Sequence, residues 1–474
     1  MISAQDKTIP LMQRNLSEGF ACVNTQLSLL KNQTGLIQVG EFLSQATQLA
    51  NQLPAGKHLI NLCENRYLFT LSFCAAIIKG QTTLLPQNRA EETQRNLLNE
   101  YADTYLLHDS LSLLQESSAK EFLPTDIPQI NLHQLTLRKD IATEIPMIDA
   151  DFLAAIAFTS GSTGKPKANK KYWRTFAIST LMNGSAMLPK IDELIQVLAT
   201  VPAQHMWGME TSVLMPFFWR VCVSDLRPLF PQDIAKSLTS LTAPRLLVTT
   251  PVHLRALVNS KISMPTCSRI LCATAPLSSS LADEAEKVFA GDLLEVYGCS
   301  EIGSTAYRST AKSESTYWTL IDGLQFTSEI ESDIVTHKIV GDHLPDAQLL
   351  QDQLDIQGNQ FQLLGRNEDM IDIGGKRGSL LEMNALLLTA PGVTDGVVFL
   401  LEADCNKNQI QRPAALVVAP ETSRAEITTH FSKHLDPVFM PRPLVFVSEL
   451  PREENGKLRR VRLLEFYKNL RSGI

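Results

Sequence analysis

The chain has 474 residues, of which 44% are hydrophobic and 20% are charged, and it carries a formal net charge of −7. That length exceeds one compact core, so we expect two or more domains, and the composition is typical of a folded globular protein rather than a disordered or fibrous one. An acidic charge balance argues against non-specific nucleic-acid binding, which needs a basic face. We therefore expect a small-molecule substrate and no nucleic-acid partner.

Membrane insertion and secretion are not expected from the sequence. The longest apolar stretch, residues 68–78, has about half the length of a membrane-spanning helix, and Thr70 and Ser72 interrupt it. The N-terminus lacks the basic flank and apolar run of a secretory signal. The cysteines are scattered, without the spacing of a zinc site or a disulfide framework. We predict reduced thiols, no membrane span and a cytoplasmic location.

Hydrophobic periodicity predicts alternating strands and helices in the first part of the chain. HLINLCEN (58–65) predicts a buried strand, RYLFTLSFCAAIIKG (66–80) a helix, and TTLLP (82–86) the next strand. The alternation recurs at residues 246–258 and 268–298. We expect an α/β fold whose large N-terminal domain holds mostly parallel sheets flanked by helices.

The pattern changes in the last third of the chain. From about Ser309 the periodicity weakens, until residues 353–364 predict a pair of strands. A Gly-rich turn, a helix at 380–388 and two strands, GVVFLL and AALVVA, then predict a small α+β domain. We place the domain boundary between a large domain, 1–365, and a small domain, 366–474.

A loop of small, hydroxylated and flexible residues follows the apolar segment FLAAIAF. In this loop, TSGSTGKPK, glycines let backbone N–H groups approach oxyanions, hydroxyls add donors, and lysines supply positive charge. The sequence therefore predicts a phosphate-binding loop, with a flexible surface turn as the alternative. Its candidate residues are Thr159, Ser160, Gly161, Ser162, Thr163, Gly164, Lys165 and Lys167.

A kinase-type nucleotide loop is the main competing interpretation of these residues. Such a loop needs a longer spacer between its glycines and a Ser or Thr directly after the lysine, to hold Mg²⁺. Here Gly161 and Gly164 are closely spaced, and Pro166 follows Lys165. The spacing argues against a phosphoryl-transferring kinase or ATPase.

The loop resembles the TSGTTGKPKG-like hallmark of the adenylate-forming superfamily: acyl-CoA synthetases, peptide-synthetase adenylation domains and luciferases. The resemblance covers most of the chain and implies a large domain followed by a small mobile domain. VYGCSEIGS (296–304) resembles the superfamily's YGxTE segment, which implies that Tyr297 stacks on adenine and Glu301 binds Mg²⁺. A flat ring suits a purine, and a hard carboxylate oxygen suits Mg²⁺. The nucleotide contacts implied by this segment include Gly298 and Ser300.

Two further segments resemble parts of the nucleotide and acid sites. ATAPLS (273–278) stands where the superfamily has GGAPLS beside the adenine, which implies a nucleotide contact at Ala275. His205, in VPAQHMWGM, stands where the superfamily often has an aromatic residue or His beside the acyl pocket, although a lone histidine is more often structural. The predicted pocket residues are His205, Trp207, Thr250, Thr274 and Cys299.

GRNEDMIDIGGKRGSLLEM (365–383) resembles the hinge between the two domains of the superfamily. The resemblance implies that Arg366 contacts the nucleotide, that Glu368 is the pivot, and that Gly374 and Gly375 enter the tunnel for the thiol. The pivot is usually Asp or Lys, so Glu368 departs from the pattern. A plain linker is the alternative.

Two more ligands of the nucleotide follow from alignment with the superfamily. QDQLDIQGNQFQLLGR places Asp352 where a carboxylate binds the ribose hydroxyls, with Asp355 as the alternative if the register slips. ELPREENGKLRRVRL resembles the terminal LPxTxxGKxxR segment, which implies that Lys457 reaches the carboxylate and the α-phosphate during adenylation. The predicted catalytic residues are therefore Lys457, Glu301, Thr159 and Lys167.

Together these segments predict an AMP-forming acid–thiol ligase. It would convert a carboxylic acid, ATP and Mg²⁺ into acyl-AMP, and then transfer the acyl group to CoA or to the phosphopantetheine of a carrier protein. FTSGSTGKPKANKKYW is similar to ligases of bacterial aryl-polyene clusters, which implies an aromatic acid and a carrier protein. A basic segment from Arg442 onward fits an acidic carrier. The alternatives are a degenerate, non-catalytic protein of the same fold and a kinase or ATPase.

Overall fold

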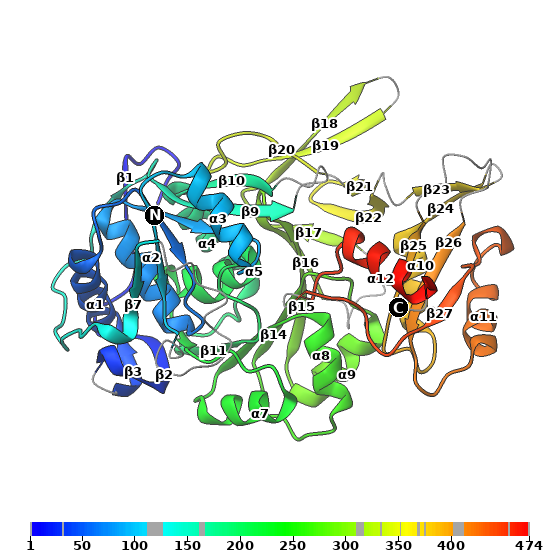
Figure 1. The fold of residues 1–474 in the computed structure, drawn as a ribbon, viewed down its shortest axis with the longest axis horizontal. Helices are drawn as coiled ribbons and strands as arrows, with labels where there is room; N and C mark the ends of the chain where they lie inside the picture. Colours follow the sequence, from blue (N-terminus) through cyan, green and yellow to red (C-terminus); the bar gives the residue numbers. More distant parts are fainter. Residues whose placement is uncertain are drawn as a thin grey trace.

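The computed structural model describes residues 2–30, 33–110, 127–160, 166–309, 317–331, 334–350, 352–366, 370–373, 376–401, 412–453 and 456–472. In Figure 1 the chain forms a large body, coloured blue to yellow, and a smaller body at its C-terminal end, coloured orange to red. Both bodies combine helices with sheets. This is the expected α/β arrangement of a large N-terminal domain and a small C-terminal domain.

The first sheet of the large domain has six strands in the order β10-β9-β5-β4-β6-β7. All neighbouring pairs are parallel except β9 with β10. The strands are β4 (His58–Asn61), β5 (Thr82–Leu85), β6 (Thr104–His108), β7 (Gln129–Asn131), β9 (Leu153–Ser160) and β10 (Pro166–Tyr172). A separate pair joins β1 (Thr8–Pro10) to β8 (Met147–Asp149).

The second sheet has eleven strands in the order β21-β22-β17-β16-β15-β14-β13-β11-β12-β2-β3. Its centre, from β2 to β15, is parallel, whereas the pairs at both ends are antiparallel. Mostly parallel pairing was therefore a correct prediction for the first sheet and for the centre of the second. The strands are β2 (Gly19–Leu27), β3 (Gln33–Gln38), β11 (Ile195–Ala199), β12 (Val221–Ser224), β13 (Arg245–Thr249), β14 (Arg269–Ala273), β15 (Asp292–Cys299), β16 (Gly303–Arg308), β17 (Trp318–Leu320), β21 (Asp352–Gln357) and β22 (Gln360–Arg366).

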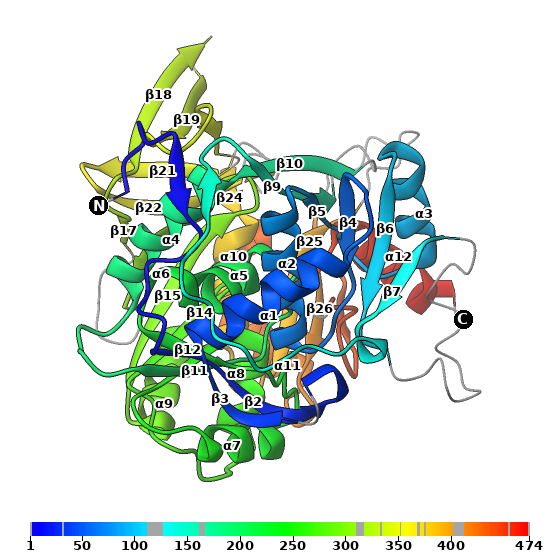
Figure 2. The ribbon, with the colours of Figure 1, turned by 90° about the vertical axis from the view of Figure 1, so that its left-hand side faces the viewer.

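Helices cover the sheets on two sides. One core packs α1, α2 and α4 against side chains from both sheets, and Figure 2 shows α1 and α2 in front of the strands. A second core packs α7, α8 and α9 against β11, β13, β14 and β15. The helices are α1 (Val39–Gln52), α2 (Arg66–Lys79), α3 (Glu91–Glu100), α4 (Trp173–Met187), α5 (Met206–Met209), α6 (Met215–Phe218), α7 (Pro231–Ser240), α8 (Pro251–Asn259) and α9 (Ser279–Phe289).

Local sequence signals set the ends of the predicted helix after β4. The Asn65 side chain accepts a hydrogen bond from the Leu68 N–H at 3.1 Å, and this N-cap satisfies a free donor of the first turn. Gly80 ends α2 with φ +76°, a left-handed conformation that glycine adopts without strain.

Within the described residues, no helix combines the length and apolar character needed to span a membrane.

A three-stranded sheet, β18 (Gln325–Glu331), β19 (Ile334–Val340) and β20 (Gln348–Leu349), lies where the sequence periodicity weakens. The β18–β19 hairpin projects from the body in both Figure 1 and Figure 2. Gln325, Thr327 and Ser328 are all exposed, although they fall on both sides of the strand. The apolar alternation that reveals a half-buried strand is therefore weak there.

The small domain has its own cores. Its sheet pairs β25 (Asp395–Leu400) antiparallel with β26 (Pro413–Val418), and β26 parallel with β27 (Leu444–Phe446). Two apolar clusters cover this sheet. The remaining elements are β23 (Met370–Ile373), β24 (Lys376–Ser379), α10 (Leu380–Thr389), α11 (Arg424–Ser432) and α12 (Arg460–Ser472). The predicted helix and both predicted strands are present. Along the chain, the last residue of the second sheet is Arg366, at the end of β22. The domain boundary after residue 365 stays a prediction.

Candidate active site

The predicted phosphate loop joins β9 to β10, which pair as an antiparallel hairpin. Ser160 lies opposite Pro166, and Thr159 lies opposite Lys167. Thr159 Oγ1 accepts a hydrogen bond from Asn169 Nδ2 at 3.2 Å, so its position is fixed from the neighbouring strand. The side chain of Ser160 is outside the described part of the structure, as are the loop residues Gly161, Ser162, Thr163, Gly164 and Lys165.

Glu301 lies in the turn between β15 and β16, next to the hairpin of the phosphate loop. Lys167 Nζ donates to Glu301 Oε1 at 3.2 Å, across 134 residues of sequence. Burial alone would raise the pKa of the Glu301 carboxyl, but hydrogen bonds from its own backbone N–H and from Lys167 bring that pKa below its usual value. The carboxylate is therefore ionised at neutral pH. Ser300 lies half-buried in the same turn.

Tyr297 and Asp352 meet at the edge of the second sheet. The Tyr297 hydroxyl donates to Asp352 Oδ2, and its ring centroid lies 5.7 Å from the rings of both Trp318 and Phe361. Asp352 begins β21 directly opposite Arg366 at the end of β22. The Arg366 side chain is outside the described residues. The structure thus brings Asp352 to the predicted adenine-binding tyrosine.

Asp355, the alternative ribose ligand, points elsewhere. It is exposed and accepts a hydrogen bond from the Tyr317 hydroxyl at 3.4 Å. Successive residues of a strand alternate between its two faces, so Asp352 and Asp355 do not share a face. The geometry favours Asp352 beside Tyr297.

The carboxyl ends of β14 and β15 carry one predicted acyl-pocket residue, Thr274, and the remaining predicted nucleotide contacts. Thr274 follows β14 with φ +88°, an unusual conformation for a residue other than glycine, and Ala275 comes next, half-buried. Gly298 is exposed where the pairing of β15 with β16 shifts register. A Cβ at Gly298 would lie 2.2 Å from the Gly303 carbonyl oxygen, so only glycine fits. In parallel sheets this edge is where ligands bind.

The predicted acyl-pocket residues divide into two groups. His205, at the start of α5, and Cys299 are partly exposed. Trp207 is buried and donates from Nε1 to the Thr249 carbonyl oxygen at 3.2 Å. Thr250 is fully buried and caps α8 by accepting from the His253 N–H at 3.4 Å. Trp207 and Thr250 thus have clear structural roles.

The turn with Lys457 lies against the large domain. Lys457 is exposed, and its carbonyl oxygen accepts from the Glu453 N–H at 2.8 Å. Gly456, with φ +79°, approaches α8 so closely that a Cβ there would lie 3.6 Å from Thr250 Oγ1 and 3.7 Å from Val252 Cγ2. The lysine turn therefore packs on the N-terminus of α8.

A shared carboxylate supports this packing. Asp395 of β25 accepts two hydrogen bonds from Arg452, each 2.7 Å long, and Arg452 also donates to the Gly456 carbonyl oxygen at 3.0 Å. Arg255 of α8 approaches the same carboxylate at 3.9 Å. The predicted pivot Glu368 and the predicted tunnel glycines Gly374 and Gly375 lie outside the described residues.

Sequence reasoning missed a buried charged group behind Glu301. Lys171 of β10 is 2% exposed and donates to the Glu301 carbonyl oxygen at 2.7 Å. Lys167, Asn169 and Lys171 alternate along the strand and thus share one face. That alternation of polar residues next to a predicted buried strand was the signal that could have identified them.

Glu210 is the second charged group in this interior. It begins a π-helix, Glu210–Leu214, and is 2% exposed. Its carboxylate accepts from the Ser304 N–H at 3.0 Å and from Ser304 Oγ at 2.7 Å. Burial raises the pKa of Glu210, while the bonds from Ser304 and the Lys171 ammonium lower it. Burial has the opposite effect on the Lys171 ammonium and lowers its pKa, whereas the charge of Glu210 raises that pKa.

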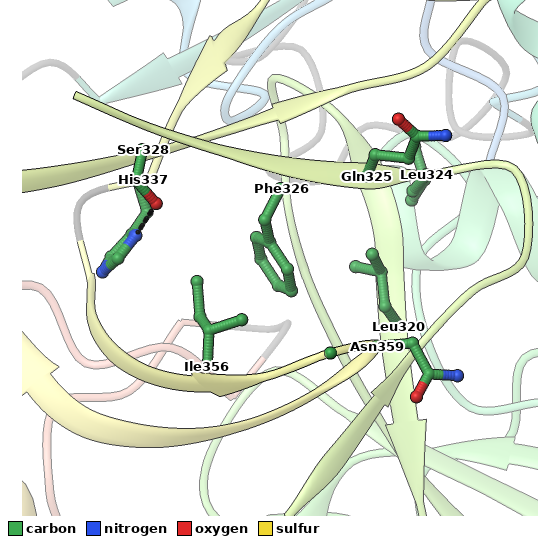
Figure 3. A pocket seen from close by; sticks show the side chains of 9 residues that line it. Leu320, Leu324, Gln325, Phe326, Ser328, His337, Ile356 and Asn359 are labelled. Carbon is green, nitrogen blue, oxygen red and sulfur yellow. Dashed lines mark hydrogen bonds between the residues drawn. The ribbon is translucent and has the colours of Figure 1, made fainter.

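A cavity of about 690 Å³ lies apart from these residues, between the β18–β19 hairpin and the β21–β22 turn. Figure 3 shows Phe326, Ile356 and Leu320 around it, and the hydrogen bond between Ser328 and His337 at its edge. Tyr297 does not line it; the Phe361 ring packs against both Phe326, at 5.3 Å, and Tyr297, at 5.7 Å. This cavity is distinct from the candidate active site.

Comparison with known proteins agrees with the motifs. The family model of the AMP-binding enzyme matches residues 41–331, and that of the AMP-binding enzyme C-terminal domain matches residues 382–457. The 4-coumarate–CoA ligase of Rhodobacter capsulatus is 27% identical over 315 residues, which cover 64% of this chain and 74% of that protein. The 3,4-dihydroxybenzoate–(aryl-carrier protein) ligase of Bacillus anthracis is 22% identical over 315 residues, 65% of this chain and 73% of that protein.

The fold is also shared with a solved structure. The anthranilate CoA ligase AuaEII in complex with anthranoyl-AMP is 14% identical, has a TM-score of 0.79, and matches over 100% of both chains. Since the family model covers more than half of the sequence, the chain belongs to the AMP-binding enzyme family, the adenylate-forming superfamily that its motifs predicted.

Proposed function

We propose that the chain is an ATP-dependent acid–thiol ligase that forms an acyl-adenylate and then transfers the acyl group to a phosphopantetheine thiol. The carrying observation is the convergence of Glu301, Lys167 and Tyr297 at one sheet edge, with the Lys457 turn packed nearby on α8. Lys167, Glu301 and Lys457 come from distant parts of the sequence, and Tyr297 precedes Glu301 by four residues. A site for a nucleoside triphosphate needs a flat ring for the base, an acceptor for the ribose hydroxyls, cationic side chains for the phosphates and a ligand for the metal ion.

In the first half-reaction, a carboxylate oxygen of the acid attacks the α-phosphorus of ATP. The bond from this phosphorus to the bridging oxygen breaks, and pyrophosphate leaves as acyl-AMP forms. Lys457 and Lys167 neutralise the negative charge that gathers on the acid and the phosphates. Tyr297 and Asp352 hold the nucleoside, so the reaction relies on positioning rather than on a protein nucleophile.

Glu301 is the residue proposed to hold Mg²⁺. Within the described residues, no three His, Cys, Asp or Glu side chains gather to form a protein cage for a metal. Mg²⁺ is commonly bound by one or two carboxylates together with substrate phosphates, and an ionised, partly exposed Glu301 fits that pattern. When bound, the cation stabilises the charge of the leaving pyrophosphate. Lys167 would then exchange its partner Glu301 for a phosphate oxygen.

In the second half-reaction, the thiol attacks the acyl carbonyl carbon, and AMP leaves with the electron pair of the broken C–O bond. The small domain is proposed to rotate about Glu368, which would withdraw Lys457 and bring Gly374 and Gly375 to the thiol. Two features favour an aromatic acid and a carrier-protein thiol. One is the similarity of the phosphate-loop segment to aryl-polyene-cluster ligases. The other is the dihydroxybenzoate–(aryl-carrier protein) ligase among the relatives.

The direct test is acid-dependent exchange of labelled pyrophosphate into ATP, measured with a panel of aromatic and aliphatic acids. We expect exchange with at least one acid and its loss when Mg²⁺ is chelated. A degenerate protein of the same fold would bind nucleotide without exchange. A kinase would release ADP rather than AMP and pyrophosphate. Either result would contradict the proposed function.

A further inference from the structure

The turn of residues 299–304, which carries Glu301, is held from inside the protein at two points. Lys171 Nζ donates to the Glu301 carbonyl oxygen at 2.7 Å, on the inner side of the turn. The Glu210 carboxylate accepts from both the N–H and the Oγ of Ser304, at 3.0 and 2.7 Å. The two holding side chains come from different elements, β10 and the π-helix after α5.

Both holding groups are charged and almost completely buried, at 2% exposure each. An isolated buried charge is costly, so an ammonium and a carboxylate in one interior compensate each other. A main-chain carbonyl and N–H could have been satisfied by neutral side chains. The charges make the hydrogen bonds stronger than neutral ones and fix the backbone more firmly.

The turn also fits tightly around Glu210. Gly303 has φ +102°, and a Cβ there would lie 2.0 Å from Glu210 Oε1. The carboxylate therefore fills the space that any other residue at position 303 would need. The main chain on both sides of Ile302 thus has little freedom to move.

From this geometry we propose that Lys171 and Glu210 form a clamp, the turn clamp, whose function is to preset the backbone that presents Glu301 to Mg²⁺·ATP. The inference rests on the proposed function. Lys171 and Glu210 are positioning residues, since they hold the backbone of Glu301 and of Ser304 rather than the reacting atoms. Groups of this kind, which orient a metal ligand, typically change metal affinity or activity by about tenfold to a hundredfold when they are removed.

The test compares Lys171→Met/Glu210→Gln with Glu210→Gln alone. The glutamine oxygen can still accept from Ser304, so the two variants differ by the ammonium that holds Glu301. The double variant removes both buried charges, whereas Glu210→Gln alone leaves the Lys171 ammonium without this carboxylate, so the double variant is also compared with the wild type. Lys170→Met is the matched control, since this neighbouring lysine is exposed on the opposite face of β10. The Kd of ATP is measured for each variant with Mg²⁺ and with EDTA. The melting temperature and the hydrogen–deuterium exchange of the backbone amides in residues 299–304 are measured as well.

For the double variant, we expect about a tenfold loss of the affinity that Mg²⁺ adds to ATP binding. The Kd in EDTA should stay unchanged, and deuterium exchange in the turn should be faster. The lysine control should match the wild type. If the double variant does not fold, Ser304→Ala tests the other arm of the clamp, and we expect a smaller loss in the same direction.

Two results would overturn the clamp in different ways. In the first, the double variant folds, Mg²⁺ raises its ATP affinity as much as in the wild type, and its deuterium exchange is unchanged. Lys171 would then have only a structural role in the core. Absence of ATP binding by the wild-type chain would instead contradict the proposed function, and the clamp with it.

Discussion

Tyr297 and Asp352 are 55 residues apart in the sequence, yet one hydrogen bond joins them in the candidate nucleotide site. This contact favours Asp352 over Asp355 as the predicted ribose ligand. Alignment with the superfamily left Asp352 and Asp355 as candidates because its register could slip, and strand periodicity alone does not say which of them faces Tyr297. The pairing of β21 with β22 favours Asp352.

We predict that Asp352→Ala raises the KM for ATP by about tenfold to a hundredfold, the loss expected for a hydrogen bond to a charged group. Asp355→Ala is the matched control and should leave the KM unchanged, because that carboxylate faces Tyr317. The measurement is pyrophosphate exchange at varied ATP concentration. A larger effect at Asp355 would mean that the assignment of the ribose ligand is wrong.

Residues within recognisable sequence motifs were easier to predict as site residues than residues whose role depends on burial in the tertiary structure. Glu301, Lys167 and Tyr297 stand in motifs whose spacing is set by the ligand, so the motif alone indicated them. Lys171 shares an alternating polar pattern with Lys167 and Asn169, but that pattern does not show that Lys171 is buried, and nothing local distinguishes Glu210 from a solvated charge. Only tertiary structure brings Lys171 to the carbonyl of Glu301.

At the scale of elements, several strands with continuous apolar runs, such as β4, β5, β13 and β14, were predicted, and those of the projecting β18–β19 hairpin were not. A strand buried on both faces needs apolar residues throughout, whereas a hairpin exposed to solvent needs few. The turn between β15 and β16 belongs to neither class. Its shape depends on Gly303, whose left-handed backbone and missing side chain both matter.

We predict that Gly303→Ala lowers the free energy of unfolding by about 1–3 kcal/mol more than Gly35→Ala does. Gly35 has nearly the same φ, +105° against +102°, but an added Cβ there meets nothing within 4 Å. The backbone strain is therefore matched, and the difference isolates the clash with Glu210. Urea denaturation of the two variants measures it. Equal destabilisation would show that Glu210 moves aside at little cost.

At the scale of the whole molecule, the proposed role of Lys457 would tie catalysis to the placement of the small domain. We predict that Lys457→Ala lowers pyrophosphate exchange by about a hundredfold or more, the effect expected when a group that stabilises transition-state charge is removed. Thioester formation from supplied acyl-AMP should stay largely intact. Lys468→Ala, an exposed lysine of α12, serves as the control. Equal loss of both half-reactions would contradict the use of two domain positions.

The basic C-terminal segment is the second feature of the whole molecule with a testable role. Arg452 and Arg459 are already paired within the small domain, with Asp395 and Glu453. Arg460 and Arg462 are exposed at the start of α12 and remain candidates for steering an acidic carrier protein.

We predict that a holo carrier protein is acylated faster than free CoA, with a rate that falls as salt screens the charges. Charge reversal at Arg460 and Arg462 should lower this rate and remove most of its salt dependence. Rates are compared for both acceptors across ionic strengths. Faster acylation of free CoA at every salt concentration would refute the carrier protein as acceptor and leave the adenylation chemistry unaffected.

The shared carboxylate of Asp395 also bears on how such chains can be recombined. Its two short bonds go to Arg452, inside the small domain, while its contact with Arg255 of α8 is long, at 3.9 Å. The turn before Lys457 is thus supported by residues of its own domain. In a chimera that takes all residues after 366 from another family member, the turn would therefore arrive together with the residues of the small domain that support it. The recipient would have to supply the surface of α8 on which Gly456 rests.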